Sequence, residues 1–166
     1  MNQNREKGFT LVELLVVIAI VAILAGAVLV AINPLRIMRE SRDAQRLSDM
    51  DTLNRALSFA LADEEIRLLA NGNGNSVSGS TAVDGSGWVS YQKVDPDGPG
   101  LGKYLSVLPV DPVNNSDYYY EFASSADAYE LNAILESQKY QSKMENDGGS
   151  DPNRYEIGSD PGLKLL

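Results

Sequence analysis

The chain has 166 residues, a formal net charge of −9, and neither cysteine nor histidine. The missing cysteine excludes a disulfide framework, thiolate catalysis and cysteine-bound zinc. The missing histidine removes the commonest general base and transition-metal ligand. The acidic balance also disfavours general nucleic-acid binding, which needs an excess of Lys and Arg to neutralise phosphates. We therefore expect neither an enzyme nor a nucleic-acid partner, and the length allows one modest domain plus an anchor.

The first predicted element is an apolar helix over residues 9–32, which follows a short polar segment containing Arg5 and Lys7. A run of this length can span a bilayer, because about 20 helical residues cover the hydrocarbon core. The flanking positive charges place the N-terminus in the cytoplasm. Glu13 lies within this run, and a carboxylate inside a membrane span is costly and marks a functional position by default. The alternative is a side chain that merely reaches the headgroups.

Asn33 and Pro34 interrupt the apolar run. Proline removes a backbone donor and clashes with the preceding turn, so we expect a kink or a local break there, in a region that Gly26 weakens further. Apolar residues then recur at three- and four-residue steps, which predicts that the long helix continues as an amphipathic half over residues 33–70. These residues are Leu47, Met50, Leu53, Leu57 and Leu61. The charged residues between them are expected to face solvent. They include Arg42, Asp43, Arg46 and Asp49.

Residues 71–166 are predicted to form a small β domain with a loop-rich C-terminus. Residues 71–87 are rich in glycine, serine and asparagine and are expected to be turns. Residues 118–135 alternate around a short polar turn, which predicts an antiparallel hairpin, and residues 88–92 or 154–157 are candidates for further strands. One hairpin is marginally stable alone. We therefore expect an α+β fold in which the long helix packs on a small antiparallel sheet.

The sequence KGFTLVELLVVIAIVAILAGAVL, which begins at Lys7, closely resembles the N-terminal processing and methylation segment of the type IV pilin superfamily. That superfamily includes type IV pilins, the pseudopilins of type II secretion systems and the minor pilins of DNA-uptake machines. The resemblance implies a pilin-like fold. It also implies that a prepilin peptidase removes residues 1–8 by cutting between Gly8 and Phe9, and that the new Phe9 amine is N-methylated. Glu13 is then expected to meet that amine on a neighbouring subunit.

Three aspartates lie in the glycine-rich C-terminal tail: Asp147, Asp151 and Asp160. Calcium prefers several oxygen ligands on a flexible loop, and the resemblance adds weight, because major pseudopilins bind calcium in a C-terminal loop. The spacing of the three aspartates matches neither that loop nor an EF-hand, so a plain solvated loop is the alternative. Calcium is the one cofactor candidate that the sequence offers.

The combined prediction is a structural subunit of a type IV pilus-like filament, assembled through its hydrophobic N-terminal helix. The expected partners are further copies of the chain, a prepilin peptidase, a membrane-embedded assembly platform and the cytoplasmic membrane. The chain is expected to enter that membrane as a single-pass precursor and to leave it for a filament in the envelope or outside the cell. Two alternatives stay open: a pseudopilin of a type II secretion or DNA-uptake system, and a membrane-anchored exported domain that binds a ligand.

Overall fold

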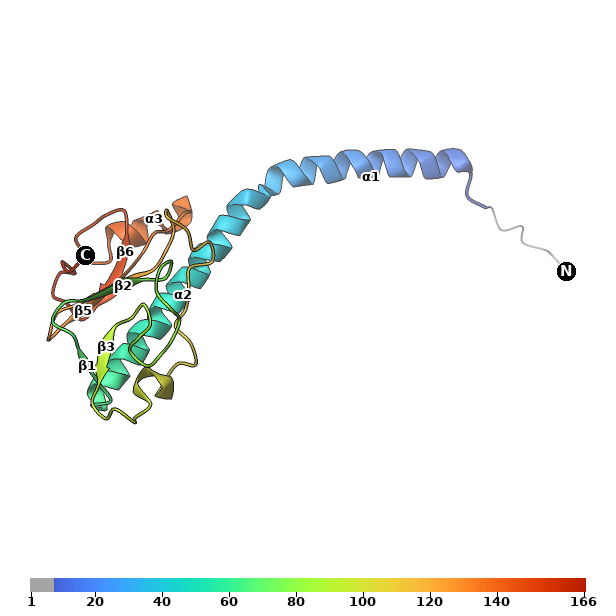
Figure 1. Cartoon of the computed structure of the whole chain (residues 1–166). Coiled ribbons are helices and arrows are strands. Elements are labelled where there is room, and N and C mark those ends of the chain that lie inside the picture. The colour runs from blue at the N-terminus through green and yellow to red at the C-terminus, as the bar shows by residue number, and fades with distance from the viewer. Residues whose placement is uncertain (1–7) are drawn as a thin grey trace. The chain divides into compact units, whose positions relative to one another are not determined.

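The computed structural model describes residues 8–166, except for the side chains of Val30 and Ala31. The chain divides into two compact units, one that ends at Met38 and one that runs from Arg39 to Leu166. Two helices come first in the chain, and six strands with short helices between them follow (Figure 1). The predicted α+β class, with a long apolar N-terminal helix followed by a small antiparallel sheet domain, is confirmed.

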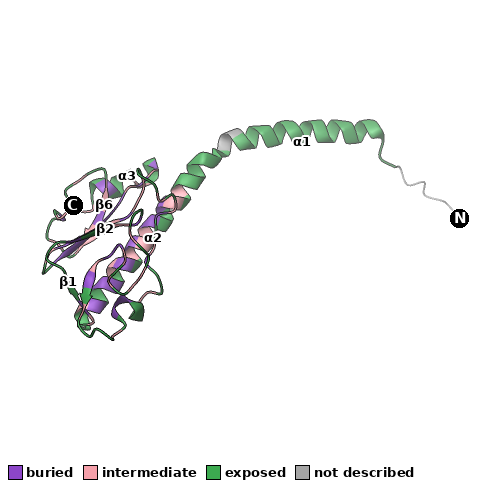
Figure 2. Cartoon of the chain, viewed as in Figure 1, coloured by how far each residue is buried: buried purple, intermediate pink, exposed green. Residues whose placement is uncertain are grey.

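The first unit is built around helix α1, Leu11–Ile32. Every described side chain of α1 is exposed (Figure 2), and the segment Leu11–Leu29 is long and apolar enough to cross a membrane. α1 ends at Asn33, which has a left-handed backbone with φ 47° and ψ 80°, and helix α2 begins at Pro34. A left-handed residue stops a helix, and proline suits the first helical position because its missing N–H would have no partner there.

Helix α2, Pro34–Ala62, supplies the long helix of the second unit from Arg39 onward. Its buried residues recur at three- and four-residue steps, and this stripe faces the strands in Figure 2. From Met50 onward the buried residues of α2 are apolar, and they pack in one core with side chains from the strands and loops: Trp88, Leu101, Leu108, Tyr120, Phe122, Tyr129 and Leu131. Burying one large apolar side chain stabilises a fold by roughly 1.5–3 kcal/mol. The packing of this stripe is therefore the main interaction that holds the helix against the sheets.

The prediction that the helix continues to residue 70 is wrong, because α2 ends at Ala62. Glu64 takes a left-handed φ of 55° just after the end, which turns the chain out of the helix. Strand β1, Ile66–Leu68, follows and pairs antiparallel with β3, Tyr91–Lys93. In β1 the apolar residues are Ile66 and Leu68. A run this short cannot be assigned to a helix or a strand from the spacing of its apolar residues.

The second sheet has four antiparallel strands in the order β2-β4-β5-β6. Their bounds are Gly72–Asn75, Glu121–Ser124, Tyr129–Ala133 and Tyr155–Gly158. β4 and β5 form the predicted hairpin, with Glu121 opposite Asn132 and Ser124 opposite Tyr129. β3 and β6 overlap the two segments proposed as further strands.

The expectation of turns throughout residues 71–87 is wrong for β2, whose sequence is GNGN. A Cβ on Gly74 would lie 2.2 Å from the carbonyl oxygen of Trp88, so the two backbones approach more closely than any side chain permits. Glycine inside a strand often marks such an approach. Two short helices complete the fold: the 3-10 helix η1, Gly100–Lys103, and α3, Gln138–Glu145, which the sequence pattern did not predict.

The four-stranded sheet is covered on both faces where β5 crosses it. Alternate residues of a strand point to opposite faces, and all five residues of β5 are buried. Tyr129, Leu131 and Ala133 belong to the apolar core. Glu130 and Asn132 therefore face the opposite side, where the N–H of Leu165 in the C-terminal tail reaches Glu130. Helix α3 packs against β6.

Candidate functional site

Gly8 and Phe9, the predicted cleavage pair, lie directly before α1. Phe9 is 82% exposed, and a Cβ built on Gly8 would meet no atom within 4 Å. Packing within the chain therefore does not require a glycine at position 8 or a phenylalanine at position 9. Both residues are accessible to another molecule, which is what cleavage between them would need.

Thr10 and Glu13 form a capping box at the start of α1. The hydroxyl oxygen of Thr10 accepts a hydrogen bond from the N–H of Glu13 at 3.2 Å. Oε2 of Glu13 accepts hydrogen bonds from the N–H and the hydroxyl of Thr10 at 2.8 and 2.9 Å. These bonds satisfy amide groups that a helix start leaves free, and the carboxylate lies at the positive end of the helix dipole. Glu13 thus has a local role as well, and both bonds end on Oε2, so Oε1 stays outside the capping box.

Sequence reasoning missed Thr10, although the spacing of a threonine three residues before a glutamate is a recognised signal for a helix start. The apolar run and its neighbouring glycine drew attention to Glu13 as a membrane charge instead. The structure shows that the same carboxylate also begins the helix.

The helix break falls at Asn33, whereas α1 continues through Gly26 without interruption. The N–H of Arg36 donates to the backbone oxygen of Asn33 at 3.0 Å and to its side-chain oxygen at 3.4 Å. Asn33 therefore ends α1 and caps α2, with Pro34 as the first residue of α2. A Cβ on Gly26 would meet nothing within 4 Å, so no contact within the described chain explains that glycine.

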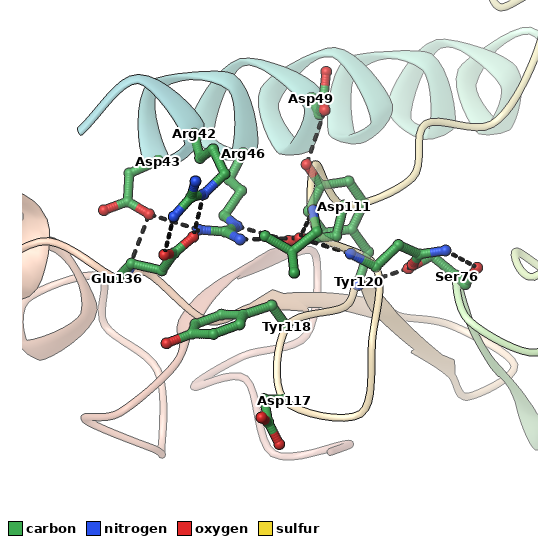
Figure 3. A network of polar contacts seen from close by, with 12 residues as sticks. Arg42, Asp43, Arg46, Asp49, Ser76, Asp111, Asp117, Tyr118, Tyr120 and Glu136 are labelled. Atoms are coloured by element: carbon green, nitrogen blue, oxygen red, sulfur yellow. Dashed lines mark hydrogen bonds and ion pairs between the residues drawn. The ribbon is translucent and has the colours of Figure 1, made fainter. Parts of the chain in front are cut away.

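A buried ion network joins α2 to two loops of the second unit (Figure 3). Arg46 donates to both carboxylate oxygens of Asp111, at 2.6 Å from Nε and 2.9 Å from Nη2. Its Nη1 donates to Asp43 at 2.8 Å and to Glu136 at 2.6 Å. The side chains of Arg46, Asp43 and Asp111 have no exposed surface. Bidentate arginine–carboxylate pairs are among the strongest protein hydrogen bonds, so Arg46 fixes α2 to both loops.

Further groups complete this network. Arg42 donates to the two carboxylate oxygens of Glu136 at 2.7 and 2.5 Å. That hydrogen bond lowers the pKa of Glu136, although burial acts in the opposite direction. Asp43 accepts the N–H groups of Glu136 and Ser137 at 2.9 and 2.7 Å, and the ring of Tyr118 lies 5.0 Å from the guanidinium carbon of Arg46. Each carboxylate therefore has donors that satisfy it.

The prediction that Asp43 and Arg46 face solvent is wrong, because both are fully buried. They occupy the same face of α2 as the apolar stripe, since 43, 46, 50 and 53 continue its three- and four-residue spacing. This spacing was the sequence signal that could have identified them as buried. Their charge argued against burial, since charged residues are seldom fully buried unless paired.

The three tail aspartates do not gather around one point. Asp147 accepts the N–H groups of Gly149 and Glu156 at 2.9 and 2.8 Å. Asp151 accepts the N–H of Asn153 at 2.9 Å, and Asp160 accepts the N–H of Lys164 at 2.9 Å. Among residues 8–166, no three acidic side chains are placed to hold a metal ion. These aspartates close turns in the structure, and they do not assemble the predicted calcium site.

Residues 3–29 match the family model described as the prokaryotic N-terminal methylation motif. This motif is the prepilin-type cleavage signal of type IV pilins and pseudopilins, and the match covers both Gly8 and Glu13. The resemblance found in the sequence is thereby confirmed for the N-terminal segment. No solved structure matches the chain significantly.

Proposed function

We propose that this chain, whose N-terminal motif marks a type IV pilin-like or pseudopilin precursor processed by a prepilin peptidase, is a structural subunit of a pilus-like filament. The observation that carries the proposal is α1, an apolar helix whose described side chains are all exposed, placed directly after the processing motif. Apolar surface of this extent requires cover. Lipid supplies that cover before assembly, and α1 helices of neighbouring copies supply it in the filament.

Moving α1 from lipid into a filament core needs more than apolar burial, because lipid tails are as apolar as the helix itself. Packing between helices supplies one favourable contribution, and pairing of charges supplies the second. A buried charge is costly alone and tolerated when an opposite charge lies beside it. In the proposal, the carboxylate of Glu13 is the charge that makes a partner subunit necessary.

The partner charge in this proposal is the amine that cleavage creates at Phe9. A single N-methylation leaves that amine positively charged. Thr10 already holds Oε2 of Glu13, which leaves Oε1 for a second donor. We therefore assign Oε1 to the Phe9 amine of a neighbouring subunit, with the capping box holding the carboxylate in place for it. The chain would pass from the cytoplasmic membrane to the filament through an assembly platform.

Mass spectrometry of the N-terminus, on chain purified from its own membranes, tests the processing step. An N-methylated Phe9 is the expected result, and Gly8→Arg is expected to leave the leader in place. An intact Met1 in the natural chain would refute the proposal and favour a plain membrane-anchored exported domain.

Glu13→Ala tests the assembly step. The variant is expected to insert and to be cleaved, but to be lost from purified filaments, because the Phe9 amine then has no carboxylate. Thr10→Val is the matched control, since it removes the hydroxyl from the capping box and keeps the charge of Glu13. Normal filaments from Glu13→Ala would contradict the charge pairing. Equal loss in both variants would show that the helix start matters and the charge does not.

A further inference from the structure

Two glutamates are buried on the face of the four-stranded sheet that lies opposite the apolar core. Glu130 on β5 has no exposed surface, and Glu156 on β6 is 2% exposed. Glu130 lies opposite Gly158 and Asn132 lies opposite Glu156, so the two glutamates are diagonal neighbours on one face, within reach of long side chains. Buried acidic side chains are rare unless they are paired, and the proposed assembly function uses neither of them.

The hydrogen bonds of the two carboxyl groups follow the same pattern. Oε2 of Glu130 accepts the N–H of Leu165 at 2.7 Å, and Oε2 of Glu156 accepts the N–H of Asp151 at 2.8 Å. The other oxygen of each, Oε1, is buried and has no hydrogen-bond partner among the described residues. Two ionised carboxylates in this position would repel each other and leave two buried oxygens unsatisfied.

We propose that Glu130 and Glu156 share one proton between their Oε1 atoms above the pH at which the unfolded chain loses it, and that this glutamate pair is a pH-sensitive contact that holds the C-terminal tail. One proton makes one carboxyl group a donor and leaves the other an acceptor. A single hydrogen bond then satisfies both Oε1 atoms and removes one of two buried charges. Loss of the proton leaves two like charges side by side, and their repulsion pushes the carboxylates apart. Because the Oε2 atoms hold Leu165 and Asp151, that movement loosens the tail and the loop after α3 together.

The groups around the pair favour retention of the proton. Burial raises the pKa of Glu156, the neighbouring carboxyl group of Glu130 raises it further, and the charge of Asp147 acts in the same direction. The N–H of Asp151 opposes them. The surroundings of Glu156 therefore favour a proton on its carboxyl group.

No described cation on the neighbouring elements neutralises the pair instead. Arg154 is held by Glu121 of β4 at 2.5 Å, with Asp151 at 3.7 Å. Lys139 on α3 pairs with Glu40 at 3.6 Å, and Lys143 and Glu145 on α3 and Lys164 on the tail are exposed. The remaining acidic side chain on the tail is that of Asp160, which accepts the N–H of Lys164. The buried amide of Asn132, which lies opposite Glu156 and also has no hydrogen-bond partner among the described residues, is neutral, so a proton is what the site has to offset the second charge.

The sign of the pH effect follows from proton counting. The folded chain keeps a proton on the pair at pH values where the unfolded chain has lost it, since an unperturbed glutamate titrates near pH ~4.3. Stability from the pair is therefore complete below that pH and is lost as the pH rises through the raised pKa of Glu156. Within that window the melting temperature should fall by about 3–6 °C per pH unit relative to a variant that cannot titrate.

The test compares melting curves of the full chain in detergent micelles from about pH 5 to about pH 9. Fluorescence of Trp88 reports unfolding, because it is the only tryptophan and is buried. Glu156→Gln keeps the shape and donates to Glu130 as a protonated carboxyl group would. Glu145→Gln, at an exposed position of α3, is the matched control. The melting temperature of Glu156→Gln is expected to rise above that of the natural chain as pH increases, while Glu145→Gln follows the natural chain. A difference independent of pH would overturn the proposal.

Two further measurements keep the proposal falsifiable if the variant folds poorly. Infrared spectra of the natural chain at about pH 5, just above the unfolded glutamate value, should contain the band of a protonated carboxyl group, and its absence would refute the shared proton. Millimolar calcium chloride should leave the melting temperature unchanged. A rise in the natural chain that Glu156→Gln abolishes would show that the pair holds a cation instead of a proton.

Discussion

Replacing Arg46 with methionine is the most direct test of what holds the second unit together. The substitution removes the guanidinium that Asp43, Asp111 and Glu136 share, at 2.8, 2.6 and 2.6 Å. Methionine keeps an unbranched side chain and leaves the carboxylates without their common cation. Removing one partner of a buried ion pair costs about 3–5 kcal/mol. That loss is a large share of the roughly 5–15 kcal/mol by which such domains are stable.

Urea unfolding of the full chain in micelles, followed by the fluorescence of Trp88, measures this loss. The matched control is Arg55→Met, because Arg55 forms a surface pair with Asp51 on the same helix, with side chains 68% and 49% exposed. Exposed pairs at this spacing contribute only about 0.3–0.5 kcal/mol. The two variants therefore remove the same charge and differ in burial. An Arg46→Met loss below ~1 kcal/mol would refute the reasoning, since the buried network would then be worth no more than a surface pair.

Acid provides a second check on the same variant. The hydrogen bond from Arg42 lowers the pKa of Glu136 in the natural chain. Its stabilising contribution is therefore present above the unfolded glutamate value of ~4.3 and is lost as the pH falls through the lowered value. In Arg46→Met, protonation removes carboxylate charges that have lost their cation. The difference in unfolding free energy between the natural chain and Arg46→Met should become smaller below about pH 4. A difference that stays constant with pH would contradict an electrostatic origin.

Three other predictions concern the second unit. Gly74→Ala places a Cβ 2.2 Å from the Trp88 carbonyl oxygen, so unfolding free energy should fall by about 1–3 kcal/mol; an unchanged urea midpoint would contradict that contact. Tyr120→Phe removes the 2.8 Å hydrogen bond from the Tyr120 hydroxyl to Asp49, a carboxyl group whose pKa is raised by burial. The unfolding free energy should fall by about 1–3 kcal/mol, and an unchanged value would argue that water replaces the hydroxyl. Calcium titration should not raise the melting temperature, because Asp147 and the other tail aspartates close separate turns; a rise would show that the loop rearranges around the ion.

The spacing of apolar residues along the sequence predicted the elements that are determined by nearby residues. The apolar run predicted α1, three- and four-residue spacing predicted the buried stripe of α2, and alternation predicted the β4–β5 hairpin. The processing segment was recognisable because its residues are contiguous. Gly8, Phe9 and Glu13 lie within six positions of one another, so no folding is needed to see them together.

The features that sequence reasoning missed depend on contacts between distant segments. β2 has a turn-like composition, and only its pairing with β4 and its approach to Trp88 make it a strand. Arg46 and Asp111 are 65 residues apart, so nothing local distinguishes them from surface charges. The same holds for Glu130 and Glu156, which look like ordinary strand residues until the register places them together.

Local residues determine both ends of helix α1: it begins at the capping box of Thr10 and ends at the left-handed residue Asn33. Its 22 residues measure about 33 Å at ~1.5 Å per residue, close to the ~30 Å of a hydrocarbon core. Helical cooperativity travels along an unbroken ladder of hydrogen bonds, and Pro34 has no N–H with which to extend that ladder. We therefore expect thermal fraying that starts in α1 to stop at residue 33. The turns of α2 that pack on the sheets should then unfold at a temperature that does not depend on α1.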